Sequence, residues 1–148
     1  ITVWNYAERR PVCTLESNAA GNRHCFTWKA DSRHAAVLGL KGSIAIWDAL
    51  TGKNLRELED KQQAKSLAWS PDGNWLAVGR ADNAIQLWDM TKEQMGPTRA
   101  GHTKAPTSLA WSPDSKWLAS HAYRESIVNV WDVEGKLLKS RTRRILNP

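Results

Sequence analysis

The chain has 148 residues, 41% of them hydrophobic, and no apolar run approaches the 18 residues of a membrane span, so the composition predicts a soluble globular protein with no membrane segment. Its two cysteines, Cys13 and Cys25, are too few for a disulfide framework and lack metal-site spacing, which weakly favours a cytoplasmic location. The net charge is +6, and the basic residues near the C-terminus indicate either a solvated connector or a segment that binds nucleic acid or acidic partners.

From its first residues onward the chain repeats one pattern, a short apolar run that ends in Trp followed by Asp or Asn. The four copies are Val3-Trp4-Asn5, Ile46-Trp47-Asp48, Leu87-Trp88-Asp89 and Val130-Trp131-Asp132, and their tryptophans recur at steps of 43, 41 and 43 residues. A second set, Trp28, Trp69 and Trp111, recurs at steps of 41 and 42 residues. Two markers with one period indicate a repeated unit, and this period with a Trp-Asp signature is typical of a four-stranded propeller blade.

In chain order, the pattern predicts a half-blade, three whole blades and a basic tail or connector. Residues 1–16 supply the last two strands of one blade. The whole blades cover residues 22–59, 64–99 and 106–141, and the tail covers 142–148. The strands predicted in the whole blades are 23–28, 33–38, 43–47 and 53–58; 65–69, 74–78, 84–88 and 93–99; and 107–111, 116–120, 127–131 and 136–140.

The middle blade shows the local signals for these strands. The segment Ser70-Pro71-Asp72-Gly73 predicts a turn, because Pro fixes φ at the second turn position and Asp-Gly follows naturally. Apolar residues occur on both faces of the first strand, at Leu67, Ala68 and Trp69, as expected for sheets that are covered on both sides. Pro97 places the fourth strand at a sheet edge, where a missing N–H needs no partner.

The number of blades bears on the assembly. Closed propellers typically carry about 4–8 blades, so three and a half blades are too few to close a typical ring. Two copies would not complete each other, because both half-blades offer the same outer strands and lack the same inner ones. We therefore expect a partial, open ring cut from a longer parent chain that supplies the remaining blades.

These motifs resemble the WD-repeat β-propeller family, and the resemblance covers essentially the whole chain. It rests on the Trp-Asp endings, on the Ser-Pro-Asp-Gly turn and on Gly101-His102, whose His lies nine residues before Trp111. The resemblance implies an all-β fold of four-stranded antiparallel meanders and a non-catalytic scaffold that binds protein partners without a cofactor. By family analogy alone it also suggests the sensor region of a larger multidomain signalling protein.

The family often links a His, a Ser or Thr, an Asp and a Trp of one blade into a structural tetrad. Here His102, Ser120 and Trp131 match three members, and Glu125 lies near the Asp position. One extra residue around Glu125 leaves that position open, so no blade shows the full tetrad by sequence.

The neighbouring blade departs from the tetrad pattern. Asp82 fits the Asp position, but Asp60 replaces the His and Val78 occupies the position of the Ser. The aspartates of the Trp-Asp pairs are turn residues in this interpretation, because they recur wherever the turn recurs; they are Asp48, Asp89 and Asp132.

The sequence offers no catalytic or metal-binding constellation. No phosphate-binding loop, nucleophile elbow or Cys-His arrangement occurs. None of the four histidines is a good ligand candidate. His34 has a packing position and His102 the tetrad position, and His24 and His121 have no Glu or Cys at ligand spacing. We therefore expect no enzyme activity, no metal and no cofactor in this segment.

A candidate partner-binding rim lies on the loops that enter each blade and the loops that join its second and third strands. Propeller topology places both loop sets on one rim, and the candidate residues there are Lys41, Arg80, Lys104, Tyr123 and Arg124. Tyr and Arg are typical anchors of protein interfaces. The leading hypothesis is therefore a protein-interaction scaffold. The alternative is a basic rim that binds nucleic acid or phosphate-rich partners, together with Arg141, Arg143 and Arg144 of the tail.

Overall fold

The computed structural model describes residues 1–15, 25–39 and 42–142, and these residues form fourteen β-strands and no helix. No helix that could cross a membrane occurs in this described part. The strands are β1 (Thr2–Asn5), β2 (Arg10–Thr14), β3 (Phe26–Trp28), β4 (His34–Leu38), β5 (Ile44–Asp48), β6 (Lys53–Leu58), β7 (Ala64–Trp69), β8 (Trp75–Arg80), β9 (Ala84–Asp89), β10 (Gln94–Ala100), β11 (Pro106–Trp111), β12 (Trp117–Ala122), β13 (Ile127–Asp132) and β14 (Leu137–Thr142).

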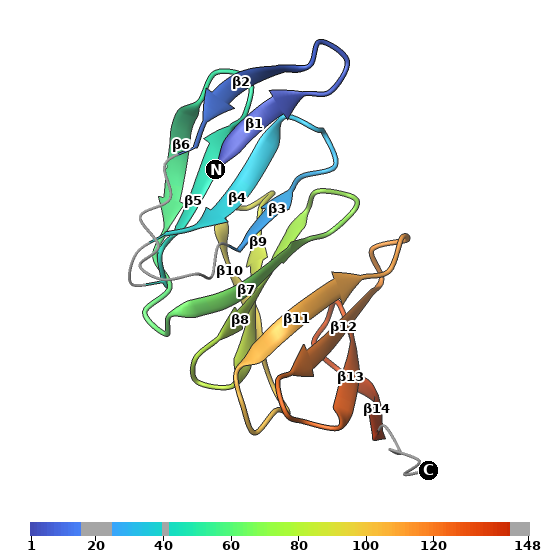
Figure 1. Ribbon diagram of the computed structural model, residues 1–148. Coiled ribbons are helices and arrows are strands. Elements are labelled where there is room, and N and C mark those ends of the chain that lie inside the picture. Colours follow the sequence, from blue (N-terminus) through green and yellow to red (C-terminus); the bar gives the residue numbers. More distant parts are fainter. Residues whose placement is uncertain (16–24, 40–41, 143–148) are drawn as a thin grey trace.

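The strands form one two-stranded sheet and three four-stranded sheets. Each four-stranded sheet is an antiparallel meander of consecutive strands, β3 to β6, β7 to β10 and β11 to β14, and β1 pairs with β2 alone. Figure 1 shows the sheets stacked as successive blades in an open row, with the half-blade at one end and the third whole blade at the other. The predicted all-β fold of three whole blades and a half-blade is confirmed.

Side chains of adjacent blades form the hydrophobic core between them. In the cluster between the first and second whole blades, Ile44 and Ile46 of β5 meet Leu67, Trp69 and Trp88. A second cluster joins the half-blade to the first blade, and a third joins the second blade to the third. A side chain of this size contributes about 1.5–3 kcal/mol when it leaves water, so most of the apolar stabilisation lies between sheets. The middle strands β4, β5, β8 and β9 are buried on both faces, which fits their mostly apolar sequences.

The turns repeat the same hydrogen bonds in successive blades. Ser70 Oγ accepts from the Trp75 N–H at 2.9 Å, and Ser112 Oγ accepts from the Trp117 N–H at 2.9 Å. Gly73 adopts a φ of 75° in the first of these turns, a value that favours glycine. The carboxylates that follow the repeated tryptophans accept backbone N–H groups from their own turns. Asp48 and Asp89 accept from the residues two and three positions on, as in Asx turns, and Asp132 accepts from Lys136 N.

Candidate functional site

A buried chain of hydrogen bonds runs through the third whole blade. The Trp131 indole Nε1–H donates to Ser120 Oγ at 2.9 Å, and Ser120 Oγ lies 2.8 Å from His102 Nε2. His102 Nδ1 lies 2.6 Å from Glu125 Oε2. Because a carboxylate only accepts, Nδ1–H donates to Glu125, and the Ser120 hydroxyl donates to the remaining ring nitrogen. Glu125 therefore stands in the tetrad position that the sequence left open.

Glu125 also joins two loops of the rim. Its Oε1 accepts from Thr103 N, Thr103 Oγ1 and Lys104 N at 2.5, 2.6 and 2.9 Å. Burial raises the pKa of this carboxyl, but the hydrogen bonds from Thr103 and His102 outweigh burial and lower the pKa to about 2. The carboxylate fixes the loop that enters the blade against the loop between β12 and β13.

We define the rim loops as residues 81–83, 101–105 and 123–126. Asn83 Nδ2 donates to Thr103 O at 3.1 Å, so the loop of the second blade is tied to the entry loop of the third. Tyr123 is 66% exposed, and the Arg124 guanidinium lies 5.4 Å from its ring centroid. Lys104 is also exposed on the entry loop. The structure therefore brings three of the predicted rim residues onto two loops that share Glu125.

Arg80, another of the predicted rim residues, turns inward from the end of β8. Its side chain is only 10% exposed, and its Nε and Nη2 donate to the Asp82 carboxylate. Its Nη1 donates to Gln86 Oε1 at 3.1 Å. The hydrogen bond from Arg80 is the main reason that the pKa of Asp82 is lowered. Lys41, the remaining predicted rim residue, lies outside the described residues.

In the second blade, Arg80 and Asp82 form an ion pair at the place that the tetrad occupies in the third blade. Asp82 accepts from Arg80 there, and no His takes part; Asp60 occupies the His position and is buried. The Trp88 Nε1 is buried without a hydrogen-bond partner, because Val78 occupies the position of Ser120. Sequence reasoning identified these replacements but missed Arg80, whose position at the end of β8 gave no signal that it turns inward.

The described part of the chain contains no group of three His, Cys, Asp or Glu side chains that could hold a metal ion. The Ser120, His102 and Glu125 geometry has the composition of a hydrolytic triad, but the side chains of His102 and Glu125 are only 1% and 7% exposed. Ser120 is itself buried, and its oxygen already accepts the Trp131 indole N–H. This arrangement suits structural support, since a nucleophile must reach its substrate.

Comparisons with known proteins agree with this architecture. The family model described as "Eukaryotic translation initiation factor eIF2A" matches residues 3–146. The chain is 32% identical to the Small ribosomal subunit protein RACK1 of Drosophila melanogaster over 99 residues, which cover 60% of the chain and 30% of that protein. It is 30% identical to the human Serine-threonine kinase receptor-associated protein over 78 residues, 52% of the chain and 22% of that protein. The chain thus spans less than a third of these relatives.

Solved structures show the same fold at low identity. The structure of U3-55K superposes with a TM-score of 0.75 at 22% identity, covering 86% of this chain and 42% of that one. The WD40 repeats of RRP9 superpose with a TM-score of 0.73 at 22% identity, covering 84% and 40%. Hydrazine synthase of Kuenenia stuttgartiensis also matches, with a TM-score of 0.70 at 21% identity and coverage of 78% and 34%. At these identities the matches describe the fold alone.

Proposed function

Because the chain belongs to the WD-repeat β-propeller family, and within it to the family described as Eukaryotic translation initiation factor eIF2A, we propose that it is a non-catalytic scaffold that binds protein partners through the rim loops. The observation that carries the proposal is the exposed Tyr123 and Arg124 pair on loops fixed by Glu125. An exposed aromatic residue stacked with an arginine on a rigid support is the kind of anchor that dominates protein interfaces.

The names of the relatives support a protein partner without specifying which one. They refer to a small ribosomal subunit protein, a cofactor of the APC complex and a receptor-associated protein. These names refer to different assemblies, so the feature that the relatives share is a fold that serves as a binding scaffold. We extend the proposal to a cytoplasmic location and to the absence of catalysis, which fits the buried hydroxyl of Ser120.

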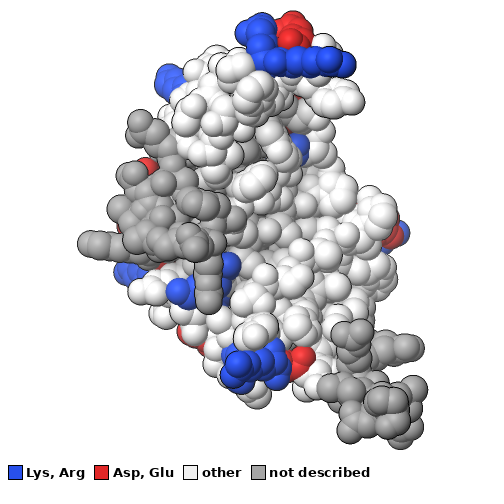
Figure 2. Space-filling model, viewed as in Figure 1, with Lys and Arg blue, Asp and Glu red and all other residues white. Residues whose placement is uncertain are grey.

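The alternative, a basic rim for nucleic acid or phosphate-rich partners, has less support. Arg80 is neutralised by Asp82, which leaves Lys104 and Arg124 as the exposed cations among the predicted rim residues that the structure describes. Figure 2 shows that the face carrying β3, β7 and β11 is mostly uncharged, with basic side chains only in separate patches. Binding to phosphates needs several cations along one track.

Affinity capture with matched tyrosine variants tests the proposal. Tyr123→Ala, alone and with Arg124→Glu, should lose partner proteins that the unchanged chain captures. Tyr6→Ala is the control, because Tyr6 is 97% exposed and lies on the β1–β2 turn at the opposite rim. Equal capture by the Tyr123 and Tyr6 variants would contradict the rim as the binding site. Capture that disappears after nuclease treatment and falls steeply with salt would favour the alternative.

A further inference from the structure

The carboxylates of the rim loops already have their partners inside the fold. Asp82 and Glu125 are the acidic side chains of these loops. Asp82 accepts from Nε and Nη2 of Arg80, which extends from β8. Glu125 accepts from His102 at one oxygen and from three donors of the entry loop at the other, which fills the four lone-pair sites of a carboxylate. Neither carboxylate of the rim loops is left to pair with an exposed cation.

The cations of the same loops remain in solvent. Lys104 and Arg124 are exposed, and within the described residues neither forms an ion pair. Lys104 reaches Glu125 through its main-chain N–H, at 2.9 Å from Oε1, so its ammonium group stays free. Arg124 directly precedes Glu125, and its guanidinium contacts the ring of the exposed Tyr123. Two exposed cations and one exposed aromatic ring therefore surround a carboxylate that is itself buried.

The loop that carries Tyr123 and Arg124 is held in one conformation. Glu125 N–H donates to Ala122 O at 3.1 Å, and His121 Nε2–H donates to Glu125 O at 2.9 Å. Arg124 between them has a φ of 64°, in the left-handed region that few residues other than glycine adopt. A loop fixed in this way loses little conformational freedom when a partner binds. The exposed ring and guanidinium are thus presented on a rigid support.

We propose that the rim loops bind an acidic segment of a partner protein, with Lys104 and Arg124 receiving its carboxylates and Tyr123 contacting its apolar groups. This inference rests on the proposed function, because it names the chemistry of the partner that the rim binds. A guanidinium binds a carboxylate through two parallel hydrogen bonds, and a tyrosine ring offers a large apolar face. Complementary charge at a rim also speeds association and excludes partners of the wrong charge.

The small extent of the positive surface favours an acidic peptide over a nucleic acid. In the second blade the exposed Lys61 lies two residues from the exposed Glu59, so their charges oppose each other. The unpaired positive charge of the rim is therefore concentrated on Lys104 and Arg124 of the third blade. A nucleic acid needs cations along an extended track, whereas one short acidic segment needs only a few.

A short labelled peptide of alternating Glu and Ala is the probe, and fluorescence anisotropy measures its binding to the 148-residue chain. We expect it to bind at least about tenfold more tightly than the same peptide with Gln in place of Glu. Salt screens exposed charges, so the affinity should fall as the ionic strength rises. Equal affinity for the Glu and Gln peptides would overturn the proposal, and so would tighter binding of an oligouridylate of the same net charge.

Neutral variants of the two cations locate the site. Arg124→Asn removes the guanidinium and suits the left-handed φ of this residue, which Asn tolerates. Lys104→Gln removes the ammonium group and keeps the main-chain N–H that Glu125 accepts. Each variant should weaken binding of the Glu peptide by about threefold, and the double variant by about tenfold. Thermal melting of each variant checks that the fold is intact.

Lys116→Gln is the matched control for charge. Lys116 is exposed in the turn between β11 and β12, at the opposite end of the same blade, so its loss removes the same charge far from the rim loops. This variant should bind the Glu peptide as the unchanged chain does. Equal weakening by Lys116→Gln and Lys104→Gln would mean that net charge alone attracts the peptide, and the proposal would be wrong.

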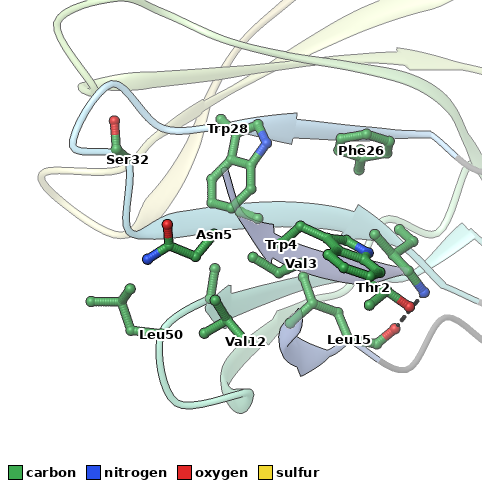
Figure 3. A pocket seen from close by; sticks show the side chains of 13 residues that line it. Thr2, Val3, Trp4, Asn5, Val12, Leu15, Phe26, Trp28, Ser32 and Leu50 are labelled. Atoms are coloured by element: carbon green, nitrogen blue, oxygen red, sulfur yellow. Dashed lines mark hydrogen bonds between the residues drawn. The ribbon is translucent and has the colours of Figure 1, made fainter. Parts of the chain in front are cut away.

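Trp4→Ala is the control for apolar binding. An apolar pocket between the half-blade and the first whole blade exposes Trp4, Phe26 and Trp28, and Figure 3 shows these rings around it. None of the residues that line this pocket has a charged side chain. An acidic peptide should therefore bind equally well to the Trp4→Ala chain, and a loss of binding there would contradict the rim as its site.

Affinity capture with the same variants separates this inference from the proposed function. Partners that Tyr123→Ala and the Lys104→Gln, Arg124→Asn double variant both lose would support the acidic partner. Partners that only Tyr123→Ala loses would leave the rim as the binding site but overturn the acidic chemistry. Partners that every variant retains would overturn the proposed function itself.

Discussion

A single side chain determines whether the buried indole N–H of each blade has a hydrogen-bond acceptor. In the third blade Ser120 provides the acceptor that the Trp131 indole needs, and Glu125 completes the chain through His102. In the first and second blades the matching indole nitrogens of Trp47 and Trp88 are buried without partners. A buried donor without an acceptor costs about 1–3 kcal/mol, so these blades depend on packing to offset that cost.

Glu125 should give the stability of the protein a pH dependence. Its pKa in the folded chain is lowered to about 2, so the carboxylate stabilises the fold at pH values above its unfolded pKa. This stabilisation is lost as the pH falls from about 4.5, the value expected for an unfolded Glu, toward about 2. Denaturant unfolding measured between pH 7 and pH 2.5 should show the decline.

The variant Glu125→Gln isolates this contribution. It should lower the free energy of unfolding by about 1–3 kcal/mol at pH 7, because the amide leaves donors from Thr103 and His102 poorly matched. Its stability should also change less between pH 4.5 and pH 2.5 than that of the unchanged chain. An unchanged pH profile in Glu125→Gln would show that other carboxyls cause the decline.

Val78→Thr should supply the acceptor that Trp88 lacks. Thr has nearly the shape of Val, and its hydroxyl stands where Ser120 stands in the third blade. A double-mutant cycle with Trp88→Phe measures the new contact. By chemical denaturation, Val78→Thr should lower the free energy of unfolding by about 1 kcal/mol less when Trp88 is present than in the Trp88→Phe chain. Equal costs in both backgrounds would mean that the hydroxyl does not reach the indole.

At the scale of elements, strands of neighbouring blades are joined by polar contacts as well as by apolar packing. Arg99 on β10 is only 2% exposed, and its Nη2 donates to Asp132 O and Val133 O of the β13–β14 turn at 2.8 Å each. Burial lowers the pKa of this guanidinium to about 10. The outer strand of the second blade is therefore fastened to the third blade by a buried cation.

Arg99→Met should loosen this junction. The Met side chain keeps much of the apolar contact but donates no hydrogen bond, which leaves two carbonyl groups without that donor. We expect the free energy of unfolding to fall by about 1–3 kcal/mol. Arg56→Met is a suitable control, because the Arg56 ion pair with Glu93 is largely exposed on the glutamate side. Denaturant curves of equal midpoint for the two variants would contradict a special role for Arg99.

For the whole molecule, the stacking of blades predicts a gradient of stability. The second whole blade has a neighbour on each face, whereas the half-blade and the third blade each have one among the described residues. In stacked repeats, local stability follows the number of neighbouring interfaces. Hydrogen exchange followed by mass spectrometry should find the slowest amides in β8 and β9 and faster ones in β1 and β2. Uniform protection from β1 to β14 would contradict this gradient.

The sequence by itself determined the fold, because the Trp-Asp pairs and the Ser-Pro-Asp-Gly turn act over a few residues. Pro71 and Gly73 set the turn locally, and the period of the tryptophans fixes the number of blades. The predicted strand bounds agree with the observed ones to within a few residues; β8, for example, was predicted at 74–78 and spans Trp75–Arg80.

Only the tertiary structure decided which polar residues face solvent and which turn inward. The sequence predicts Arg80 on the rim, but its side chain turns inward because Asp82 and Gln86 offer hydrogen-bond acceptors beside it. Glu125 completes the tetrad because the extra residue at the turn, with Arg124 at a φ of 64°, brings its carboxylate back to His102.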